Sequence, residues 1–294
     1  VHHLRLLMNE IFGEENFVAS FVWQKKYSRD NRPAIGTVHE YLVLFAKVTE
    51  EFAEVRGLLP PDEESLKVYR NPNDDPRGRW RPVPLTAQAG HATESQFYEI
   101  VSPSGVVHTP PEGRCWAVSQ ETYERLLEEG RIWFGKDGSA QPNVIRYLSE
   151  IEGFVPWTWW PCDEVGHTDQ AKKEIYSLLG RDQAFETPKP VELIKRVLRI
   201  STASEEGAVV LDFFAGSATT AQAVLELNQE DGGNRQFIMV QIPEELEAAR
   251  FSTIADVGKE RIRRVIAKMQ EGEDNAQLSL DLHADEDLGF KVFK

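Results

Sequence analysis

Residues 211–224 read LDFFAGSATTAQAV, in which a single glycine separates an aliphatic, β-prone segment from a segment with helical spacing. Apolar residues recur in the second segment at the spacing of one helix face, namely Ala218, Ala221, Val224 and Leu225. Hydroxyl side chains that would suit a helix cap stand just before it or at its start, namely Ser217, Thr219 and Thr220. The order strand, tight turn, helix predicts an α/β sheet in which this turn, at the carboxyl end of a strand, faces a ligand crevice.

The turn Asp212-Phe213-Phe214-Ala215-Gly216-Ser217 does not fit two common classes of nucleotide site. It has no lysine followed by serine or threonine at the helix start, so it is not a phosphate-binding loop. Gly216 stands alone, whereas a dinucleotide fingerprint has three spaced glycines. The residues leave two alternatives open: a turn that passes close to an uncharged or zwitterionic ligand, and an ordinary βα connection with a capping serine.

The composition is that of a globular chain with a substantial core. Its 294 residues are 41% hydrophobic and 28% charged, which suits one large or two smaller domains. No stretch approaches the roughly 18 consecutive apolar residues of a membrane span, and the N-terminus lacks the layout of a cleavable signal, so we expect a cytoplasmic protein. Cys115 and Cys162 are too few for a disulfide framework or a four-thiolate zinc site, so we expect no metal and interpret both as core residues.

Charge is unevenly distributed along the chain. The formal net charge of −15 argues against indiscriminate binding to polyanions. Residues 271–287 are acidic without a lysine or arginine, whereas residues 25–36 form a polar, basic loop. The overall balance therefore leaves room for a local basic surface.

Strand and helix patterns alternate along most of the chain. Residues 1–12 predict an amphipathic helix, and the alternating run DLGFKVFK at 287–294 predicts a strand. Further strands are expected at 16–25, 39–47, 208–213 and 235–242, and further helices at 169–179, 190–202, 218–228 and 254–269. Between about residues 52 and 165, proline-rich turns, short aromatic alternations and clustered tryptophans predict a separate α+β insert. Because the chain opens inside a helix and stops after a strand-like run, we expect it to be a fragment.

Four segments occur in an order that resembles one enzyme family. They are TVHEYLVLFAK (37–47), TPKPVELIKR (187–196), LDFFAGSATTAQAVLELN (211–228) and RQFIMVQIPEE (235–245). In this order they resemble the permuted β-class of DNA amino-methyltransferases, and most closely the modification subunits of type III restriction systems. The resemblance implies a circularly permuted, Rossmann-like methyltransferase sheet with an inserted α+β target-recognition domain. It assigns residues 1–50 and 166–294 to the methyltransferase core and residues 51–165 to the insert.

The resemblance also assigns residues to an S-adenosylmethionine site. The cofactor turn would comprise Asp212, Phe213, Ala215, Gly216 and Ser217. The segment that closes over the methionine end would comprise Thr187, Lys189 and Pro190. For Lys189 a pair with a carboxylate and a solvated lysine at a helix start are both open. His39 and Glu40 match the His-Glu pair that precedes a strand in the family; a structural role for this pair and a catalytic one are both open.

The chain departs from the family pattern at two cofactor positions. Many relatives have a second glycine where Ala218 stands, which concerns the tightness of the turn. Many methyltransferases bond the ribose hydroxyls with an acid at the end of the next strand, where this chain has Gln241, whose amide can still donate and accept.

The family's catalytic tetrapeptide, Asp/Asn-Pro-Pro followed by an aromatic residue, is absent. The only Pro-Pro pairs are Pro60-Pro61 and Pro110-Pro111, and neither precedes an aromatic residue. In the permuted order the tetrapeptide lies upstream of Val1, so the catalytic residues are unknown. The strands expected there would separate those of 16–47 from those of 208–242. We therefore expect two half-sheets with unpaired edges and exposed apolar faces, and a chain that is inactive alone and tends to associate.

Two basic segments are candidates for DNA contact. In the insert these are Arg77, Arg79, Trp80 and Arg81; the alternative is a core tryptophan flanked by a solvated arginine rim. In the first basic loop they are Lys25, Lys26 and Tyr27, together with Arg29 and Arg32; a solvated charge run is the alternative.

The resemblance implies methyl transfer from S-adenosylmethionine to adenine N6 in double-stranded DNA after base flipping. N4-cytosine methylation and a non-catalytic DNA-recognition module are the alternatives. The implied partners are double-stranded DNA, a second copy of the full-length protein and a restriction subunit with helicase and nuclease activity, without a membrane.

Overall fold

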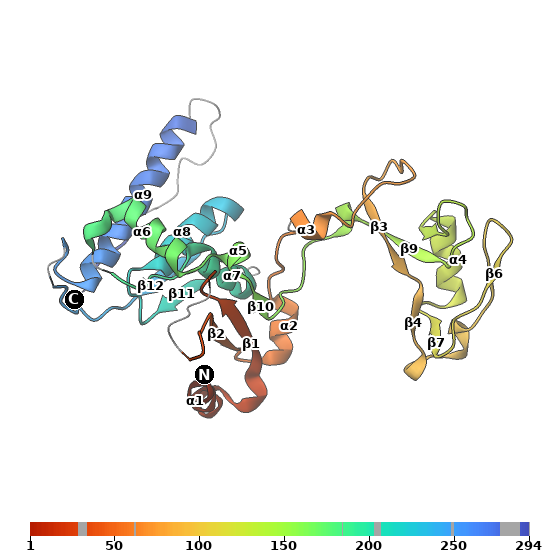
Figure 1. The fold of residues 1–294 in the computed structure, drawn as a ribbon, viewed down its shortest axis with the longest axis horizontal. Helices are drawn as coiled ribbons and strands as arrows, with labels where there is room; N and C mark the ends of the chain where they lie inside the picture. The colour runs from red at the N-terminus through yellow and green to blue at the C-terminus, as the bar shows by residue number, and fades with distance from the viewer. Residues whose placement is uncertain are drawn as a thin grey trace. The chain divides into compact units, whose positions relative to one another are not determined.

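The chain forms two compact units, shown in Figure 1. The computed structural model describes residues 1–28, 34–61, 63–183, 185–202, 207–247, 250–276 and 289–293. One unit, called here the core unit, comprises Val1–Leu59 and Val155–Lys294. The other, the insert unit, comprises Pro60–Phe154 and therefore falls inside the range 51–165 expected for the insert.

The core unit is mostly helical; its first and its last described element are both helices. Its elements are α1 (His2–Phe12), η1 (Glu14–Asn16), β1 (Phe17–Gln24), β2 (His39–Phe45), α2 (Thr49–Val55), β10 (Trp159–Trp160), α5 (Cys162–Val165), α6 (Thr168–Leu179), η5 (Arg181–Gln183), α7 (Val191–Thr202), β11 (Val209–Asp212), α8 (Thr219–Asp231), β12 (Gln236–Met239) and α9 (Ile254–Ala276).

The described strands of the core unit form two separate sheets, as the sequence predicts. β1 lies in the middle of the first, antiparallel to β2 with Val22 opposite Tyr41, and parallel to β10. β11 and β12 form the second as a parallel pair with Leu211 opposite Ile238. A parallel pair needs a crossover connection, and α8 supplies it.

Helix α8 lies between α7 and α9, and its composition explains how both approach it. Ala221, Ala223 and Val224 are fully buried. Small side chains on several faces let two neighbouring helices come close. On one side α8 packs with α7 residues Val191 and Leu198. On the other side it packs with the apolar face of α9. This arrangement fixes the N-terminus of α8, where the Gly216 turn ends.

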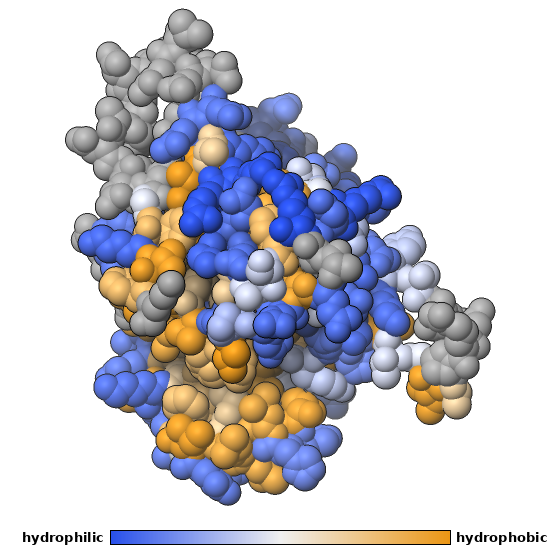
Figure 2. Space-filling view, turned by 90° about the vertical axis from the view of Figure 1, so that its left-hand side faces the viewer, coloured by the Kyte–Doolittle hydropathy of each residue, from blue (hydrophilic) through white to orange (hydrophobic). Residues whose placement is uncertain are grey.

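Two apolar surfaces of the core unit are uncovered. On β11 and β12, Val209, Leu211 and Ile238 are more than half exposed, while their sequence neighbours Val210 and Phe237 face the helices. The predicted amphipathic helix α1 is present, yet none of its residues is buried. Figure 2 shows hydrophobic side chains gathered low on this unit, the level at which Figure 1 places α1. Apolar faces of this kind mark surfaces that contact something else.

Several boundaries differ from the sequence expectation. The strand expected at 287–294 is wrong for its described part: residues 289–293 have no regular structure, and Phe290 packs beside the apolar face of α9. Helix α8 continues to Asp231 rather than 228, because Gly232 with φ 69° ends it there. Helix α9 continues to Ala276 rather than 269, through residues read as the start of the acidic stretch.

The insert unit is built from short strands and short helices. Its elements are α3 (Glu63–Leu66), β3 (Trp80–Pro84), β4 (Thr86–Gln88), η2 (Ala89–His91), η3 (Glu94–Gln96), β5 (Ile100–Val101), β6 (Val107–His108), β7 (Arg114–Trp116), α4 (Gln120–Glu128), β8 (Ile132–Trp133), β9 (Asn143–Tyr147) and η4 (Leu148–Glu150). β9 pairs antiparallel with both β3 and β8. Buried Leu85, Ile100, Trp116 and Phe134 form its main core.

Both cysteines of the chain lie in the core. Cys115 and Cys162 are free and buried, as predicted. In the described part of the chain no three His, Cys, Asp or Glu side chains gather as they would around a metal ion. Among the described helices, none has the length and apolar character needed to cross a membrane.

Candidate cofactor turn and candidate nucleic-acid interface

Asp212, at the end of β11, organises the turn that follows it. Its carboxylate accepts hydrogen bonds from the backbone N–H of Phe214, at 3.1 Å, and from the Thr220 hydroxyl, at 2.6 Å. The Ala215 N–H donates to the carbonyl of Val240, which holds the turn against the chain leaving β12. The acid of the predicted cofactor turn is therefore committed to the shape of the turn.

Gly216 is required by the conformation and by its neighbours. Its φ of 52° lies in the left-handed region, and a Cβ at this position would come within 3.1 Å of the Phe185 ring. Its N–H donates to the Gln241 side-chain oxygen at 2.7 Å. The Gln241 amide nitrogen donates to the Ile242 carbonyl. Gln241, predicted to contact the ribose, thus holds the turn in this structure, and its ribose role stays a prediction.

Ala218 has φ 59° and ψ 39°, the left-handed conformation that glycine adopts most easily. It precedes α8, and its N–H closes a tight turn onto the Ala215 carbonyl at 2.7 Å. The position at which the chain departs from the glycine of the family pattern is therefore a position where glycine would relieve strain. Such a conformation costs an alanine roughly 1–2 kcal/mol.

The predicted caps of α8 are wrong. The hydroxyl groups of Ser217 and Thr219 accept hydrogen bonds from Arg261, and Thr220 donates to Asp212. No side chain caps the N-terminus of α8. The first backbone N–H groups of a helix have no partner within the helix, so this end offers donors to an anionic group. The sequence does not indicate that Arg261 contacts this turn, because an arginine on an amphipathic helix is normally solvated.

The segment 185–190 connects the turn to the sheet of β1 and β2. Phe185 covers Gly216 at one end, and at the other the Lys189 ammonium pairs with the Glu40 carboxylate at 2.6 Å. Lys189 also lies over the Trp23 ring, 5.2 Å from its centroid. In this structure the carboxylate that Lys189 meets is that of Glu40, and the role of Lys189 at the cofactor stays a prediction.

Glu40 bridges two lysines. Its second oxygen pairs with Lys25 at 2.9 Å. Partial burial alone would raise the pKa of the Glu40 carboxyl, but the hydrogen bonds and charges of Lys189 and Lys25 outweigh it and lower that pKa. Lys25, predicted to follow a DNA backbone, is therefore already paired with a carboxylate.

The remaining predicted residues of the core unit differ in accessibility. Pro190 is buried, and a Cβ on Gly166 would meet its ring at 2.9 Å, so it anchors the segment. Thr187 is exposed. Tyr27 is 81% exposed, and Lys26 is also exposed, with contacts of its own. Arg29 and Arg32 lie outside the described residues.

A cavity of 240 Å³ lies beside the turn. Its lining is mostly apolar and includes Asp212, Phe213 and Phe214, with α7 side chains opposite. Pockets for ligands of drug size have roughly 300–1,000 Å³. A larger cavity of 480 Å³ lies among α6, α7, α8 and α9, with Glu174, Glu192, Glu226 and Glu230 in its wall, and it does not reach the turn. Phe213 and Phe214 are largely exposed and their ring centroids lie 5.1 Å apart, so the first cavity opens beside a pair of exposed aromatic rings.

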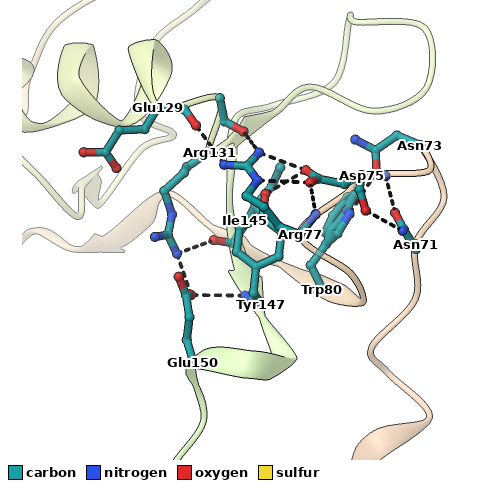
Figure 3. A network of polar contacts seen from close by, with 11 residues as sticks. Asn71, Asn73, Asp75, Arg77, Trp80, Glu129, Arg131, Ile145, Tyr147 and Glu150 are labelled. Carbon is teal, nitrogen blue, oxygen red and sulfur yellow. Dashed lines mark hydrogen bonds and ion pairs between the residues drawn. The ribbon is translucent and has the colours of Figure 1, made fainter.

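In the insert unit, Arg77 is part of a closed polar network (Figure 3). Its guanidinium forks onto the Asp75 carboxylate at 2.9 and 3.0 Å and donates to the carbonyls of Glu129 and Gly130 at the end of α4. The Tyr147 hydroxyl donates to Asp75 at 2.7 Å. The hydrogen bonds from Arg77 hold the pKa of the Asp75 carboxyl well below its usual range. Arg77 is thus committed to the fold of the insert unit.

Trp80 is also a structural residue. It is 1% exposed, its indole N–H donates to Asn73 at 2.9 Å, and its ring packs edge-on against Trp133. Such a ring is not available to stack on a base in this structure. In this structure Trp80 is therefore a core residue, and its ring does not lie on a surface that DNA could contact.

Arg79 and Arg81 remain exposed, and the structure adds a third arginine beside them. In the antiparallel pair of β3 and β9, Arg81 lies directly opposite Arg146, which is also exposed. Like charges in this position destabilise a sheet. In the described part of the chain, neither forms an ion pair with a carboxylate; Arg81 lies 5.7 Å from the centroid of the Tyr69 ring. The pairing of positions 81 and 146 has no local sequence signal, since 65 residues separate them.

Comparison with known proteins places these features in a family context. A family profile described as DNA methylase matches residues 1–251. The chain is 36% identical over 300 residues to the type III restriction-modification enzyme StyLTI Mod subunit from Salmonella typhimurium, which covers 99% of this chain and 43% of that protein. It is 30% identical to the type III enzyme EcoPI Mod subunit from Escherichia phage P1, over 98% of this chain and 47% of that protein. It is 32% identical to the type II methyltransferase M.KpnI from Klebsiella pneumoniae, over 81% of this chain and 59% of that protein. The chain thus spans about half the length of the curated relatives it matches.

Proposed function

This chain belongs to the DNA methylase family, and from that premise we propose that it forms the cofactor-binding and target-recognition parts of an S-adenosylmethionine-dependent DNA methyltransferase. The proposed reaction transfers a methyl group to adenine N6 in double-stranded DNA, as part of a type III-like restriction-modification system. N4-cytosine methylation is the nearest alternative, because an exocyclic amino group is the acceptor in both. A recognition module without catalysis is the alternative of another class.

The observation that carries the proposal is the backbone of the Gly216 turn. It ends at a helix N-terminus without a side-chain cap, and its glycine lets the Phe185 ring lie directly against the backbone of the turn. The methionine end of S-adenosylmethionine carries a carboxylate, which suits free N–H donors at a helix N-terminus. Phe213 and Phe214 present exposed apolar rings suited to the adenosine end. The donor set therefore fits the cofactor.

When bound, S-adenosylmethionine supplies an activated methyl group. The residues of this chain would bind and orient it rather than react with it, which is how enzymes lower the barrier of an in-line transfer by positioning. Lys189, held by Glu40 over Trp23, fixes the segment that ends at Phe185 and so borders the same turn.

A charge placed at Gly216 tests the cofactor site. In the full-length protein, we expect Gly216→Asp to abolish binding of S-adenosylmethionine in a calorimetric titration, because a side chain and a negative charge would oppose the carboxylate. Gly232→Asp is the matched control, since Gly232 has φ 69° at the other end of α8 and has no atom within 4 Å of a Cβ. Unchanged affinity in Gly216→Asp would show that the turn does not contact the cofactor.

For target recognition we propose the exposed face formed by Arg79, Arg81 and Arg146 of the insert unit. Two arginines held opposite each other without an acidic partner suit a phosphate backbone, which offers repeated negative charge. Within the segment predicted for DNA contact, the proposal keeps Arg79 and Arg81 as DNA-binding residues. Arg77 and Trp80 instead stabilise the fold of the insert unit.

Salt dependence separates a phosphate contact from a general loss of folding. For Arg81→Ala combined with Arg146→Ala, we expect weaker DNA binding and a salt slope reduced by roughly 2, about 1 for each arginine removed. Arg125→Ala, on the exposed side of α4, should leave the slope unchanged. An unchanged slope in the double variant would remove this face from the DNA interface.

The partners proposed for the full-length protein are double-stranded DNA in the cytoplasm, a second copy and a helicase-nuclease restriction subunit. The exposed apolar faces of β11, β12 and α1 are surfaces on which further polypeptide is expected to lie. Exchanging residues 55–165 for the insert of a relative with another target should move methylation to the relative's site, with nearly unchanged cofactor affinity. Retention of the original site in sequencing of modified bases would contradict the recognition role of the insert.

A further inference from the structure

Arg261, on α9, is a buried cation without a carboxylate partner. None of its surface is exposed. Within the described residues it forms no ion pair, and Glu174 and Glu226 act on it only through longer-range charge. Burial lowers the pKa of its guanidinium to about 10, so it remains charged at neutral pH. A buried charge is unfavourable unless hydrogen bonds satisfy it, so the acceptors that surround it reveal its role.

Those acceptors all belong to the turn and the start of α8. The Arg261 Nε donates to the Gln222 side chain at 2.7 Å. Its Nη1 donates to the hydroxyl oxygens of Ser217 and Thr219 at 3.0 and 2.8 Å, and more weakly to the Ser217 carbonyl at 3.5 Å. Nη2 has no hydrogen-bond partner among the residues that the structure describes. A planar guanidinium fork can hold these positions together, whereas an ammonium group cannot reproduce its geometry.

Gly258, three residues earlier on α9, supports the same turn. A Cβ on Gly258 would lie 3.3 Å from the Ala218 side chain and 3.4 Å from the Gly216 carbonyl. The absence of a side chain lets α9 approach the backbone of residues 216–218 closely. One face of α9 therefore contacts the inner side of the turn through both Gly258 and Arg261.

This support acts on a strained segment. Ala218 adopts a left-handed conformation that is unfavourable for alanine. A strained backbone of this kind persists only where its surroundings hold it, and Arg261 contacts the residues on both sides, Ser217 and Thr219. Without the guanidinium, residues 217–219 are free to adopt another conformation.

The position of the charge is also informative. A cation at a helix N-terminus opposes the helix dipole, so Arg261 does not stabilise α8 electrostatically. It adds to the positive potential already present at the uncapped end of α8. Such an arrangement favours an anionic group on the outer side of the turn.

We propose that Arg261 is a positioning residue for cofactor binding: it holds residues 217–219 so that the Gly216 turn accepts the carboxylate of the methyl donor. The inference rests on the proposed function, and it adds a residue remote from the predicted cofactor segments. According to this proposal, the affinity for the cofactor depends on the contact between α9 and the turn.

The test compares Arg261→Lys and Arg261→Met with Arg263→Lys in the full-length protein. Arg263 lies on the same helix with its side chain 56% exposed, so it controls for the loss of an arginine from α9. The measurements are calorimetric titration with S-adenosylmethionine, KM for the methyl donor and for DNA, kcat at saturating donor, and thermal unfolding. Methionine fills the buried site without hydrogen bonds or charge, whereas lysine keeps the charge and a donor group but lacks the planar fork.

We expect Kd for S-adenosylmethionine to rise about tenfold in Arg261→Lys and about 100-fold in Arg261→Met, as loss of one and of two net hydrogen-bond equivalents implies. The donor KM should rise in parallel, while the KM for DNA and kcat at saturating donor stay within about twofold. Arg263→Lys should behave as the wild type.

Two results would overturn the inference. One is an S-adenosylmethionine affinity within about twofold of the wild type in both Arg261 variants. The other is an equal loss of donor and DNA affinity together with a lowered melting temperature, which would describe a general folding defect. If the wild-type protein itself fails to bind S-adenosylmethionine, the proposed function is wrong; if it binds and the Arg261 variants bind equally, only this inference is wrong.

Discussion

Trp80 offers the sharpest test of how the insert unit uses its basic and aromatic segment. The sequence leaves Trp80 open as a DNA-contact residue or a core residue; the structure places it 1% exposed among Trp133, Ile145 and Tyr147. If it is a core residue, Trp80→Ala should unfold the insert unit at lower denaturant concentration. If it acted only on DNA, stability would not change.

The size of the effect follows from burial. A buried tryptophan removes about 200 Å² from water, which at about 25 cal/mol per Å² corresponds to about 5 kcal/mol as an upper estimate. Its hydrogen bond to Asn73 adds about 1 kcal/mol. Relaxation around the cavity offsets part of this, and Trp→Ala substitutions in cores cost about 3–5 kcal/mol. We therefore expect about 4 kcal/mol for Trp80→Ala and about 2 kcal/mol for Trp80→Phe, which keeps most of the ring.

Urea unfolding followed by circular dichroism measures these differences without depending on tryptophan fluorescence. Phe97→Ala is the control, because Phe97 is an aromatic residue of the same unit with about half of its surface exposed; it should cost less than about 1 kcal/mol. Trp80→Phe, folded under assay conditions, should bind DNA as the wild type does. A loss below about 1 kcal/mol in Trp80→Ala would refute the core assignment.

Three further predictions concern ionisation and strain. Burial raises the pKa values of Tyr98 and Tyr147 to about 12, so their stabilising contribution is complete below about pH 10, the unfolded value, and is lost as pH rises toward 12. Burial also raises the pKa of Tyr123, so tyrosinate absorbance should show late-titrating groups, of which Tyr147→Phe removes one. Because the pKa of Glu40 is lowered, its contribution is present above about pH 4.3 and is lost as pH falls through the folded value; Glu40→Gln should cost at most about 1 kcal/mol at neutral pH, a difference that vanishes in acid. Ala218→Gly should stabilise the chain in urea unfolding by about 0.5 kcal/mol, since relief of left-handed strain exceeds the entropy added to the unfolded state, and a loss of stability would show that the alanine side chain matters more.

The apolar pattern determined most of the secondary structure. Most predicted elements appear within a few residues of their expected ranges, among them the helices at 168–179 and 191–202 and the strands at 17–24 and 39–45. The reason is that the spacing of apolar residues, which decides which face is buried, is a property of the local sequence. The order of four motifs determined the family, and the lone glycine of the turn marked the place where strand becomes helix.

Where polar side chains point was decided only by the tertiary structure. The sequence predicts that the hydroxyl groups of Ser217 and Thr219 cap a helix. In the structure both accept hydrogen bonds from the guanidinium of Arg261, more than 40 residues later in the chain. Arg77 and Arg81 read alike in PRGRWRP, yet one forks onto Asp75 and the other faces solvent opposite Arg146. The physical reason is range: apolar burial repeats with the period of the local backbone, whereas a hydrogen bond or ion pair depends on which distant element arrives within about 3 Å.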